Sequence, residues 1–304
     1  MTQRIHAKAL VHFDTIRRCG SIRQAARQLH LSSSALNRQL LELESQIGAP
    51  LFERLSSGLR LTPSGEVLAR HVIHVLQDAQ RMSLELEALQ GLHSGHVELV
   101  TVEALTHAFI PAILKQMAQQ HPGVSTAVRI AGSSKAAEAV EDGSADVAIG
   151  FVHQRKPGLR QLAVAAFDLG AVVPPTHPLA SRETVTFAQC AQYPLVLPTP
   201  EISIFQALDP LLRAHPEPLQ VIMQTSSLEL VKQMACQGRG VAFLNRLGIE
   251  DELRRKSLVH LPLKKTQPSL LGIYVRAGRS LPPAIERFCR LAAEQMAQRQ
   301  TEAS

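Results

Sequence analysis

The stretch that decides the fold runs from residue 25 to residue 54 and reads AARQLHLSSSALNRQLLELESQIGAPLFER. Ser32 is a good N-cap for a helix. Along that helix apolar residues recur at spacings of 4, 3 and 4: Leu36, Leu40, Leu43 and Ile47. This spacing places them on one face, so the opposite face is left for polar side chains.

Two further helices are expected before this one. Residues 5–18 read as a helix that ends at Gly20. Ser21 and Gln24 then form an S-x-x-Q capping box, which opens a second helix that runs to Leu29. Together with the helix after Ser32, these elements predict a helix-turn-helix.

A short hairpin follows over residues 51–62, LFERLSSGLRLT, with its turn at Ser57-Gly58 and an arginine on each arm. Such a hairpin resembles the wing of a winged helix-turn-helix, in which arginine pairs with phosphates. The alternative is a generic three-helix bundle with a solvated charged face.

Charge favours the first interpretation. Residues 1–65 hold nine basic and four acidic side chains, 9 − 4 = +5, whereas residues 66–304 hold 23 and 22, a difference of +1. A basic head on a nearly neutral body indicates a polyanionic partner. We therefore expect binding to double-stranded DNA through exposed polar residues of the third helix and the wing: Ser32, Ser33, Ser34, Asn37, Arg38, Arg54 and Arg60.

A long helix is expected next, because Thr62 can cap it and Pro63 suits its first turn. Apolar residues recur along it at alternating spacings of 4 and 3: Leu68, Val72, Val75, Ala79, Met82, Leu86 and Leu89. This seam, about 33 Å long, predicts a two-helix dimer interface. The alternative is that the same stripe packs on its own domain. Residues 91–95, GLHSG, read as a hinge.

The remaining chain alternates strands and helices, which indicates an α/β fold. The strands are expected at 97–102, 126–130, 146–151, 170–173, 195–197, 220–225, 241–244 and 270–276. The helices between and after them are expected at 110–120, 134–141, 204–213, 228–237 and 284–298. The continuous apolar run of residues 146–151, DVAIGF, is typical of a parallel sheet covered on both faces. The last strand and helix are expected to return to the first lobe.

Ligands of such sheets bind beyond the carboxyl ends of the strands, at helix N-termini. Three such points stand out, at residues 102–105, 201–203 and 225–227. Glu103 and Glu201 suggest an effector with a positive group or several hydroxyls if both point into a cleft. The alternative is that either glutamate pairs with an arginine or faces water.

Other classes of protein are disfavoured. No apolar run is long enough for a membrane span, and the first residues lack the core of a secretory signal. The four cysteines lie far apart without a C-x-x-C pair, which fits a reducing cytoplasm and disfavours a zinc or disulfide scaffold. Neither a catalytic motif nor a phosphate loop is present, so no enzyme activity, cofactor or metal is expected.

The motif resembles the winged helix-turn-helix of LysR-type transcriptional regulators. The resemblance rests on the following residues: Ala25, Ala26, Leu29, Ser32, Ala35, Arg38, Leu43, Glu44, Gly48, Leu51, Phe52, Arg54, Leu61, Thr62 and Gly65. The chain departs from the family at Ser33-Ser34, where Gln and then Pro or Ser are common, and at Asn37, where Ser is common. Asn bonds adenine bidentately, so Asn37 predicts a different base preference.

The resemblance extends over nearly the whole chain and implies a body similar to periplasmic solute-binding proteins, with the effector pocket between two lobes. Its further marks are Pro111, residues 177–180 and residues 225–244. It implies homodimers or homotetramers, contact with RNA polymerase, and a pocket for a small-molecule effector. The residues expected to bind the effector combine the three strand ends, the pocket positions that the resemblance implies, and Phe151. They are Val102, Glu103, Ala104, Phe151, Glu201, Ile202, Ser203, Thr225 and Ser226.

The predicted organisation is a winged helix-turn-helix over residues 1–62, a dimerisation helix over 63–91 and a two-lobed effector domain over 96–304. Lobe 1 is expected at about 96–163 plus 267–304, and lobe 2 at about 164–266. Two alternatives remain open at this point. One is a redox-sensing regulator that uses Cys190 and Cys236, which are 46 positions apart and read better as buried thiols. The other is a solute-binding protein or enzyme of the same fold.

Overall fold

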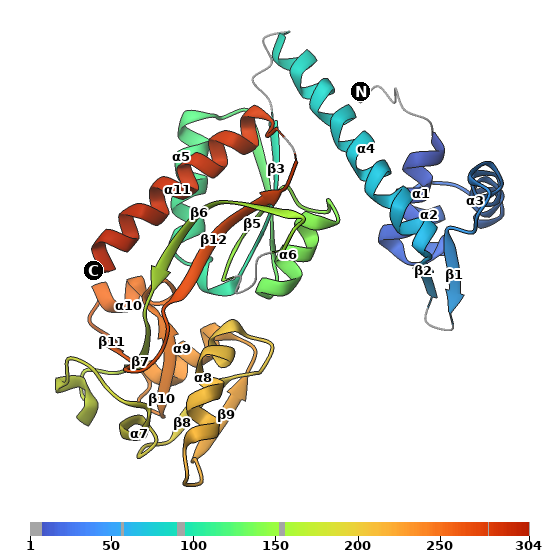
Figure 1. Ribbon diagram of the computed structural model, residues 1–304. Coiled ribbons are helices and arrows are strands. Elements are labelled where there is room, and N and C mark those ends of the chain that lie inside the picture. Colours follow the sequence, from blue (N-terminus) through green and yellow to red (C-terminus); the bar gives the residue numbers. More distant parts are fainter. Residues whose placement is uncertain (1–7, 56–57, 90–94, 152–155, 279, 304) are drawn as a thin grey trace. The chain divides into compact units, whose positions relative to one another are not determined.

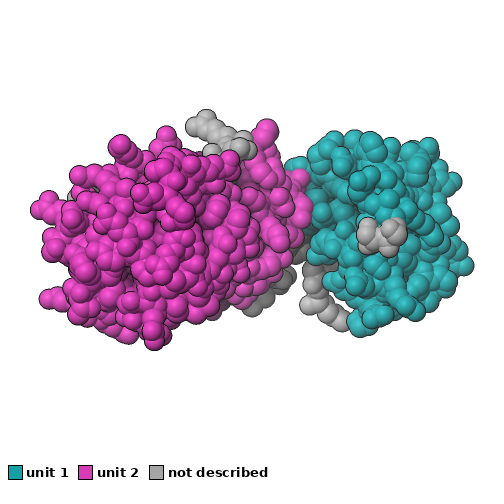
Figure 2. Space-filling view, turned by 90° about the horizontal axis from the view of Figure 1, so that it is seen from below, with its two compact units in different colours: residues 1–94 teal, residues 95–304 magenta. Residues whose placement is uncertain are grey.

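The computed structural model describes residues 8–55, 58–89, 95–151, 156–278 and 280–303. The chain forms two compact units, Met1–Ser94 and Gly95–Ser304, which Figure 2 colours separately. We call the first unit the head and the second unit the body. Across the described residues, no helix combines the length and the apolar character that a membrane span requires.

The head consists of three helices, a two-stranded hairpin and one long helix (Figure 1). Their bounds are α1 (Lys8–Cys19), α2 (Ile22–Gln28), α3 (Ser33–Ile47), β1 (Phe52–Leu55), β2 (Gly58–Leu61) and α4 (Pro63–Leu89). The expected turn at Ser57-Gly58 lies partly outside the described residues. The predicted winged helix-turn-helix is confirmed, since the hairpin directly follows the three-helix unit.

Side-chain caps explain where the head helices begin. The Ser21 hydroxyl accepts a hydrogen bond from the Gln24 amide at 3.5 Å, at the start of α2. The Ser32 hydroxyl accepts one from the Ala35 amide at 3.2 Å, at the start of α3. These bonds satisfy amides that have no partner within the helix. At the other end of α3, Gly48 takes the left-handed conformation with φ 78°, which favours glycine.

The apolar stripe of α3 faces the head core, with one exception. Leu36 and Leu40 pack with Ile16, Ala25 and Ala26, all buried. Leu43 packs in a second cluster with Phe13, Leu51, Ala69 and Val72. Ile47, expected on the same stripe, is 47% exposed, because it lies in the last turn of α3, beyond the residues that cover the core.

The first sheet of the body has the strand order β4-β3-β5-β12-β6. The strand bounds are β3 (Gly95–Thr101), β4 (Val124–Ile130), β5 (Val147–Gly150), β6 (Leu159–Phe167) and β12 (Ser269–Arg276). Its helices are α5 (Phe109–Gln120), α6 (Ser133–Glu141) and α11 (Pro283–Ala303), and the short η1 (Glu103–Leu105) follows β3.

Helices cover both faces of this sheet, as Figure 1 shows. Val147 and Ile149 of β5 pack with α5 and α11, whereas Ala148 between them packs with α6. The expected cover on both faces is therefore confirmed, whereas the expectation of a parallel sheet holds only in part. The sheet is mixed: β3 is parallel to β4 and β5, but β12 is antiparallel to both β5 and β6.

The second sheet has the order β11-β7-β10-β8-β9. Its strands are β7 (Leu169–Val173), β8 (Leu195–Pro198), β9 (Val221–Thr225), β10 (Val241–Asn245) and β11 (Val259–Pro262). The remaining helical elements are η2 (Pro178–Ser181), α7 (Phe187–Cys190), α8 (Ser203–Ala214), α9 (Leu228–Cys236), η3 (Arg246–Gly248) and α10 (Glu250–Arg254).

The chain passes between the two sheets twice, after β6 and after β11. β6 stays paired with β12 until Phe167, opposite Ser269, so the first crossing comes at Asp168, slightly later than the expected boundary at 163/164. The pairing of β12 with β5 and the cover of α11 return the C-terminal segment to the first sheet. The strands that connect the sheets thus hold two lobes side by side, and the predicted two-lobed α/β architecture is confirmed.

Candidate functional site

The start of α3 exposes a set of small polar and basic side chains. Ser33, Ser34 and Arg38 are exposed, and Asn37 is partly buried. Ser32 and Ser34 place their hydroxyl oxygens 3.2 Å apart. The capping bond to Ala35 holds Ser32 at the helix end, so the first turn of α3 presents a fixed group of hydrogen-bonding side chains to solvent.

Hydrogen bonds from β1 tie the wing to α3: the Phe52 amide donates to the Glu44 carboxylate at 3.3 Å, and a second bond comes from an arginine. Arg54 on β1 donates from Nη2 to Oδ1 of Asn37 at 3.0 Å. Arg60 on β2 is instead paired across the hairpin with Glu53 at 3.1 Å. The structure therefore brings Asn37 and Arg54 together at one place, while part of the charge of Arg60 is neutralised within the wing.

The helix α4 meets the expected dimer seam only in part. Val72 is completely buried within the head core, and Leu68 packs against the same cluster. Val72 is thus not available to a partner helix, because its own unit already covers it. Val75, Ala79 and Met82 are partly buried. The side chains of Leu86 and Leu89 lie outside the described residues.

A pocket of about 450 Å³ is lined by residues that follow strands of both sheets in the body. Its volume lies within the range of small-molecule sites. It brings together eight of the nine expected effector residues: Val102, Glu103, Ala104, Phe151, Glu201, Ile202, Ser203 and Ser226. Thr225 does not line the pocket. Its hydroxyl accepts a hydrogen bond from the Ser227 amide at 3.2 Å and so shapes the turn into α9.

Several residues that line this pocket were not expected from the sequence. They are Ile130, Ala131, Gly132, Ser133, Ser134, Lys135, Ile204, Gln206 and Leu228. The junction from β4 to α6 supplies most of them. Residues 201–203 were expected at the pocket because they lie between the end of a strand and the start of a helix. Residues 130–133 lie in the same position between β4 and α6, so the same rule predicts them. The Ser133 hydroxyl is buried without a hydrogen-bond partner.

Glu103 is engaged across the two lobes. One carboxylate oxygen, Oε1, accepts hydrogen bonds from the Ser227 hydroxyl and the Glu229 amide, both at 3.2 Å. The other, Oε2, accepts one from the Leu228 amide at 3.0 Å. These donors form the first turn of α9. The Glu103 carboxylate is therefore held by the start of α9.

Glu201 lies in a different environment from Glu103. Its side chain is exposed at the pocket rim. The hydrogen bond from its own backbone amide lowers the pKa of Glu201. Glu201 thus carries its charge in contact with solvent, whereas the Glu103 carboxylate is held by the start of α9.

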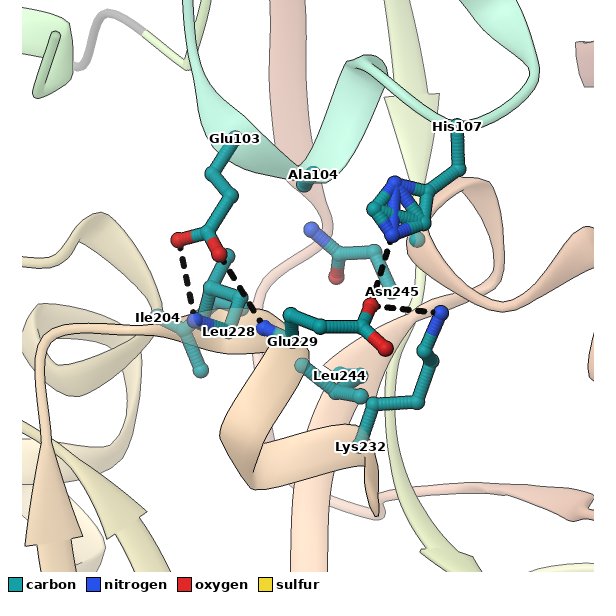
Figure 3. A pocket seen from close by; sticks show the side chains of 10 residues that line it. Glu103, Ala104, His107, Ile204, Leu228, Glu229, Lys232, Leu244 and Asn245 are labelled. Atoms are coloured by element: carbon teal, nitrogen blue, oxygen red, sulfur yellow. Dashed lines mark hydrogen bonds and ion pairs between the residues drawn. The ribbon is translucent and has the colours of Figure 1, made fainter. Parts of the chain in front are cut away.

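A second, much smaller cavity adjoins the pocket and shares Glu103, Ala104, Ile204 and Leu228 with it (Figure 3). It offers about 10 Å³ to the centre of a water molecule, which is room for one. Asn245 lines this cavity and is only 2% exposed, yet neither its amide oxygen nor its amide nitrogen has a hydrogen-bond partner.

A network of charges closes the other side of this cavity (Figure 3). His107 from the first lobe donates from Nε2 to Glu229 at 2.6 Å. Lys232 pairs with Glu229 at 2.7 Å and with Glu252 at 3.0 Å. Burial works to raise the pKa of Glu229, but hydrogen bonds from Lys232 and Gln233 outweigh it and lower this pKa. α9 is thus linked to the first lobe at two points, through Glu103 and through His107.

The cysteines of the body favour the protonated form. Cys190 is completely buried, and burial raises the pKa of its thiol to about 12. Cys236 is only partly buried, contrary to expectation, and burial also raises its pKa. Peroxide oxidises the thiolate, so a reactive cysteine needs a lowered pKa. Neither Cys190 nor Cys236 has one. Within the part of the chain that the structure describes, no cluster of His, Cys, Asp and Glu could hold a metal.

Comparisons with known proteins agree with this arrangement. The RuBisCO operon transcriptional regulator of Allochromatium vinosum is 27% identical over 277 residues, 91% of each chain. An uncharacterized HTH-type transcriptional regulator of Mycobacterium bovis is 32% identical over 286 residues, 90% of each chain. ArgP from Mycobacterium tuberculosis, a solved structure, shares the fold with a TM-score of 0.72 at 19% identity, over 97% of this chain and 98% of that one.

Residues 7–66 match the family of bacterial regulatory helix-turn-helix proteins of the lysR type, and residues 90–297 match the LysR substrate binding domain. These two matches cover residues 7–66 of the head and nearly the whole body. The chain therefore belongs to the LysR family of transcriptional regulators, with a DNA-binding head and an effector-binding body.

Proposed function

We propose that this regulator binds promoter DNA through α3 and the wing and senses a small-molecule effector in the pocket of about 450 Å³. The pocket is the observation that carries the proposal, since residues from both lobes line it. A ligand there contacts both lobes at once. It therefore stabilises one arrangement of the lobes over others, to the extent that it binds that arrangement better.

The DNA interface consists of Ser32, Ser33, Ser34, Asn37, Arg38, Arg54 and Arg60. The exposed serines and Asn37 offer hydrogen bonds to base edges in the major groove, and the arginines offer charge to phosphates. Residues 1–65, which include α3 and the wing, carry +5 of the net charge of +6. DNA binding should therefore weaken steeply as salt concentration rises.

The active form is a homodimer or homotetramer in the cytoplasm, and it regulates transcription through contact with RNA polymerase rather than by catalysis. α4 joins two chains through the part of the seam beyond the head core: Val75, Ala79, Met82, Leu86 and Leu89. Two heads joined in this way read half-sites about one helical turn, roughly 10 base pairs, or a multiple apart.

The pocket is tested by filling it. DNA sites are first selected from random oligonucleotides with the full chain. A panel of small carboxylic acids, amino acids and alcohols is then scored by the thermal shift of the full chain and by its effect on DNA affinity. Ser133→Trp, inside the pocket, should reduce affinity for any bound compound at least about ten-fold, which corresponds to about 1.4 kcal/mol.

The matched control is Ser181→Trp, because Ser181 is exposed and does not line the pocket. Both variants should bind DNA without effector as the wild type does. If Ser133→Trp keeps the full thermal shift and the full response of DNA affinity, the effector binds elsewhere and the proposal is wrong.

A further inference from the structure

The N-terminus of α9 is an anion site that the chain fills by itself. A helix N-terminus carries a partial positive charge and exposes amides that lack partners within the helix. At α9 two of these amides, of Leu228 and Glu229, donate to the Glu103 carboxylate at 3.0 and 3.2 Å. The carboxylate comes from the opposite lobe, 124 to 126 positions away in sequence.

Glu103 is not needed as an ordinary cap. Ser227 already caps α9, since its hydroxyl accepts a hydrogen bond from the Leu230 amide at 3.3 Å. The two other helices that begin at the pocket, α6 and α8, have no side-chain cap at all. One helix start thus receives a second acceptor from across the lobes while its neighbours receive none.

An independent observation marks the same corner as a place for a ligand group. Asn245 is only 2% exposed and lines the small cavity beside Glu103. Both polar atoms of its side-chain amide lack a hydrogen-bond partner. In Figure 3 its side chain lies below Ala104, on the cavity side of α9. A buried amide without a partner is costly, so a polar group that enters this corner finds donors and an acceptor ready to receive it.

We propose that Glu103 is a specificity-determining residue of the effector pocket and acts as its built-in anion. Its carboxylate occupies the anion site at the start of α9 and joins the lobes there. The wild-type pocket therefore excludes effectors that carry an acid group at this end. The statement about effectors rests on the proposed function of the pocket, whereas the filled anion site does not.

Chemical rescue tests the anion site in the full chain. Glu103→Ala removes the carboxylate and should lower the melting temperature of the body by about 2–4 °C. Sodium acetate should restore the melting temperature of this variant and bind it at least about ten-fold more tightly than it binds the wild type. Acetamide, which has the shape of acetate without its charge, should do neither when sodium chloride matches the ionic strength.

Glu201→Ala is the matched control, because Glu201 lines the same pocket with an exposed carboxylate away from any helix amide of α9. Acetate should not change its melting temperature relative to the wild type. Rescue of both variants alike, or of neither, would overturn the proposal. Equal action of acetate and acetamide on Glu103→Ala would overturn it as well, since the site would then respond to volume and not to charge.

Glu103→Gln covers the case in which the alanine variant does not fold. Glutamine keeps the length of the side chain but replaces one acceptor oxygen by a donor that faces the amides of α9. We expect the melting temperature to fall again, and an unchanged value would contradict the proposal. None of these measurements uses a natural effector, so the results are independent of whether the pocket binds one, which the Ser133→Trp experiment decides.

Discussion

Two sets of ion pairs, one in the wing of the head and one around Lys232 in the body, differ in how far they are buried. In the head, the pair of Arg60 and Glu53 has side chains that are 68% and 38% exposed. In the body, Lys232 is 5% exposed and lies between two carboxylates. An exposed pair contributes little to stability, whereas a buried charge must be paired. The charges of the wing are therefore exposed to a partner, whereas Lys232 is committed to the fold of the body.

The largest effect expected from this contrast is at Lys232. Lys232→Met leaves Glu229 and Glu252 without their shared cation, so the free energy of unfolding of the body should fall by about 3–5 kcal/mol. Arg213→Met is the control, because Arg213 pairs with Asp209 at 2.8 Å but is 80% exposed. Its cost should stay below about 1 kcal/mol. Urea unfolding followed by circular dichroism measures both, and equal costs would remove the contrast.

A second test is the pH dependence of the body, which depends on His260 of β11. Burial, reinforced by the charge of Arg246, lowers the pKa of His260 to about 4. Its Nε2 lies 3.2 Å from the Leu244 carbonyl oxygen, to which it donates. Gly170 leaves the room for the ring, since a Cβ at that position would lie 2.4 Å from Nε2.

The sign follows from the two pKa values. The unfolded chain protonates His260 near its ordinary pKa of 6.5, and the folded chain only near 4. Between these values the unfolded state binds the extra proton, so stability is lost as pH falls from 6.5 to 4, by roughly 3 kcal/mol at most. His260→Gln keeps a donor for Leu244 and cannot titrate. Its stability curve should be flatter in this window, and a curve parallel to the wild type would exclude His260 as the cause.

The fold could be predicted where local chemistry decides it. Ser21, Ser32 and Thr62 cap their helices as their positions predict; the Thr62 hydroxyl accepts a hydrogen bond from the Gly65 amide at 3.0 Å. The apolar run of β5 is likewise predictable: all of its residues are apolar or small, and all of them are buried. Caps and periodicity act within a few residues, and those are visible in one sequence.

What could not be predicted depends on which distant residue occupies a site. The spacing of Val72 fits a dimer seam, but the same spacing also fits a helix face that packs on its own core. In the structure the head core buries Val72 completely. Glu103 was correctly expected at the pocket, yet its partners lie on α9, 124 to 126 positions away. No local pattern tells whether a carboxylate faces a ligand, an arginine or a helix start.

The smallest effect concerns base preference in the head, and it depends on the bond between Arg54 and Asn37. An asparagine that reads adenine bidentately needs its amide oxygen to accept and its amide nitrogen to donate. In this head the oxygen already accepts from Arg54 at 3.0 Å. One of the two lone pairs of the oxygen is thus engaged, so we expect Asn37 to read adenine less strongly than a free asparagine and to favour base edges that accept from its amide nitrogen.

Arg54→Ala should therefore have two consequences. Affinity should fall on all sequences, with the salt slope reduced by about one, because a phosphate contact is lost. At the base that Asn37 reads, preference should also shift toward adenine, by about 1–3 kcal/mol, since the amide oxygen is released. In an Asn37→Ala background the first consequence should remain and the second should vanish. Both consequences can be measured from the affinities of Arg54→Ala and of the double variant for oligonucleotides that differ at single positions. A uniform loss with unchanged base preference would mean that the bond does not persist on DNA, and the charges of the head would then act on phosphates alone.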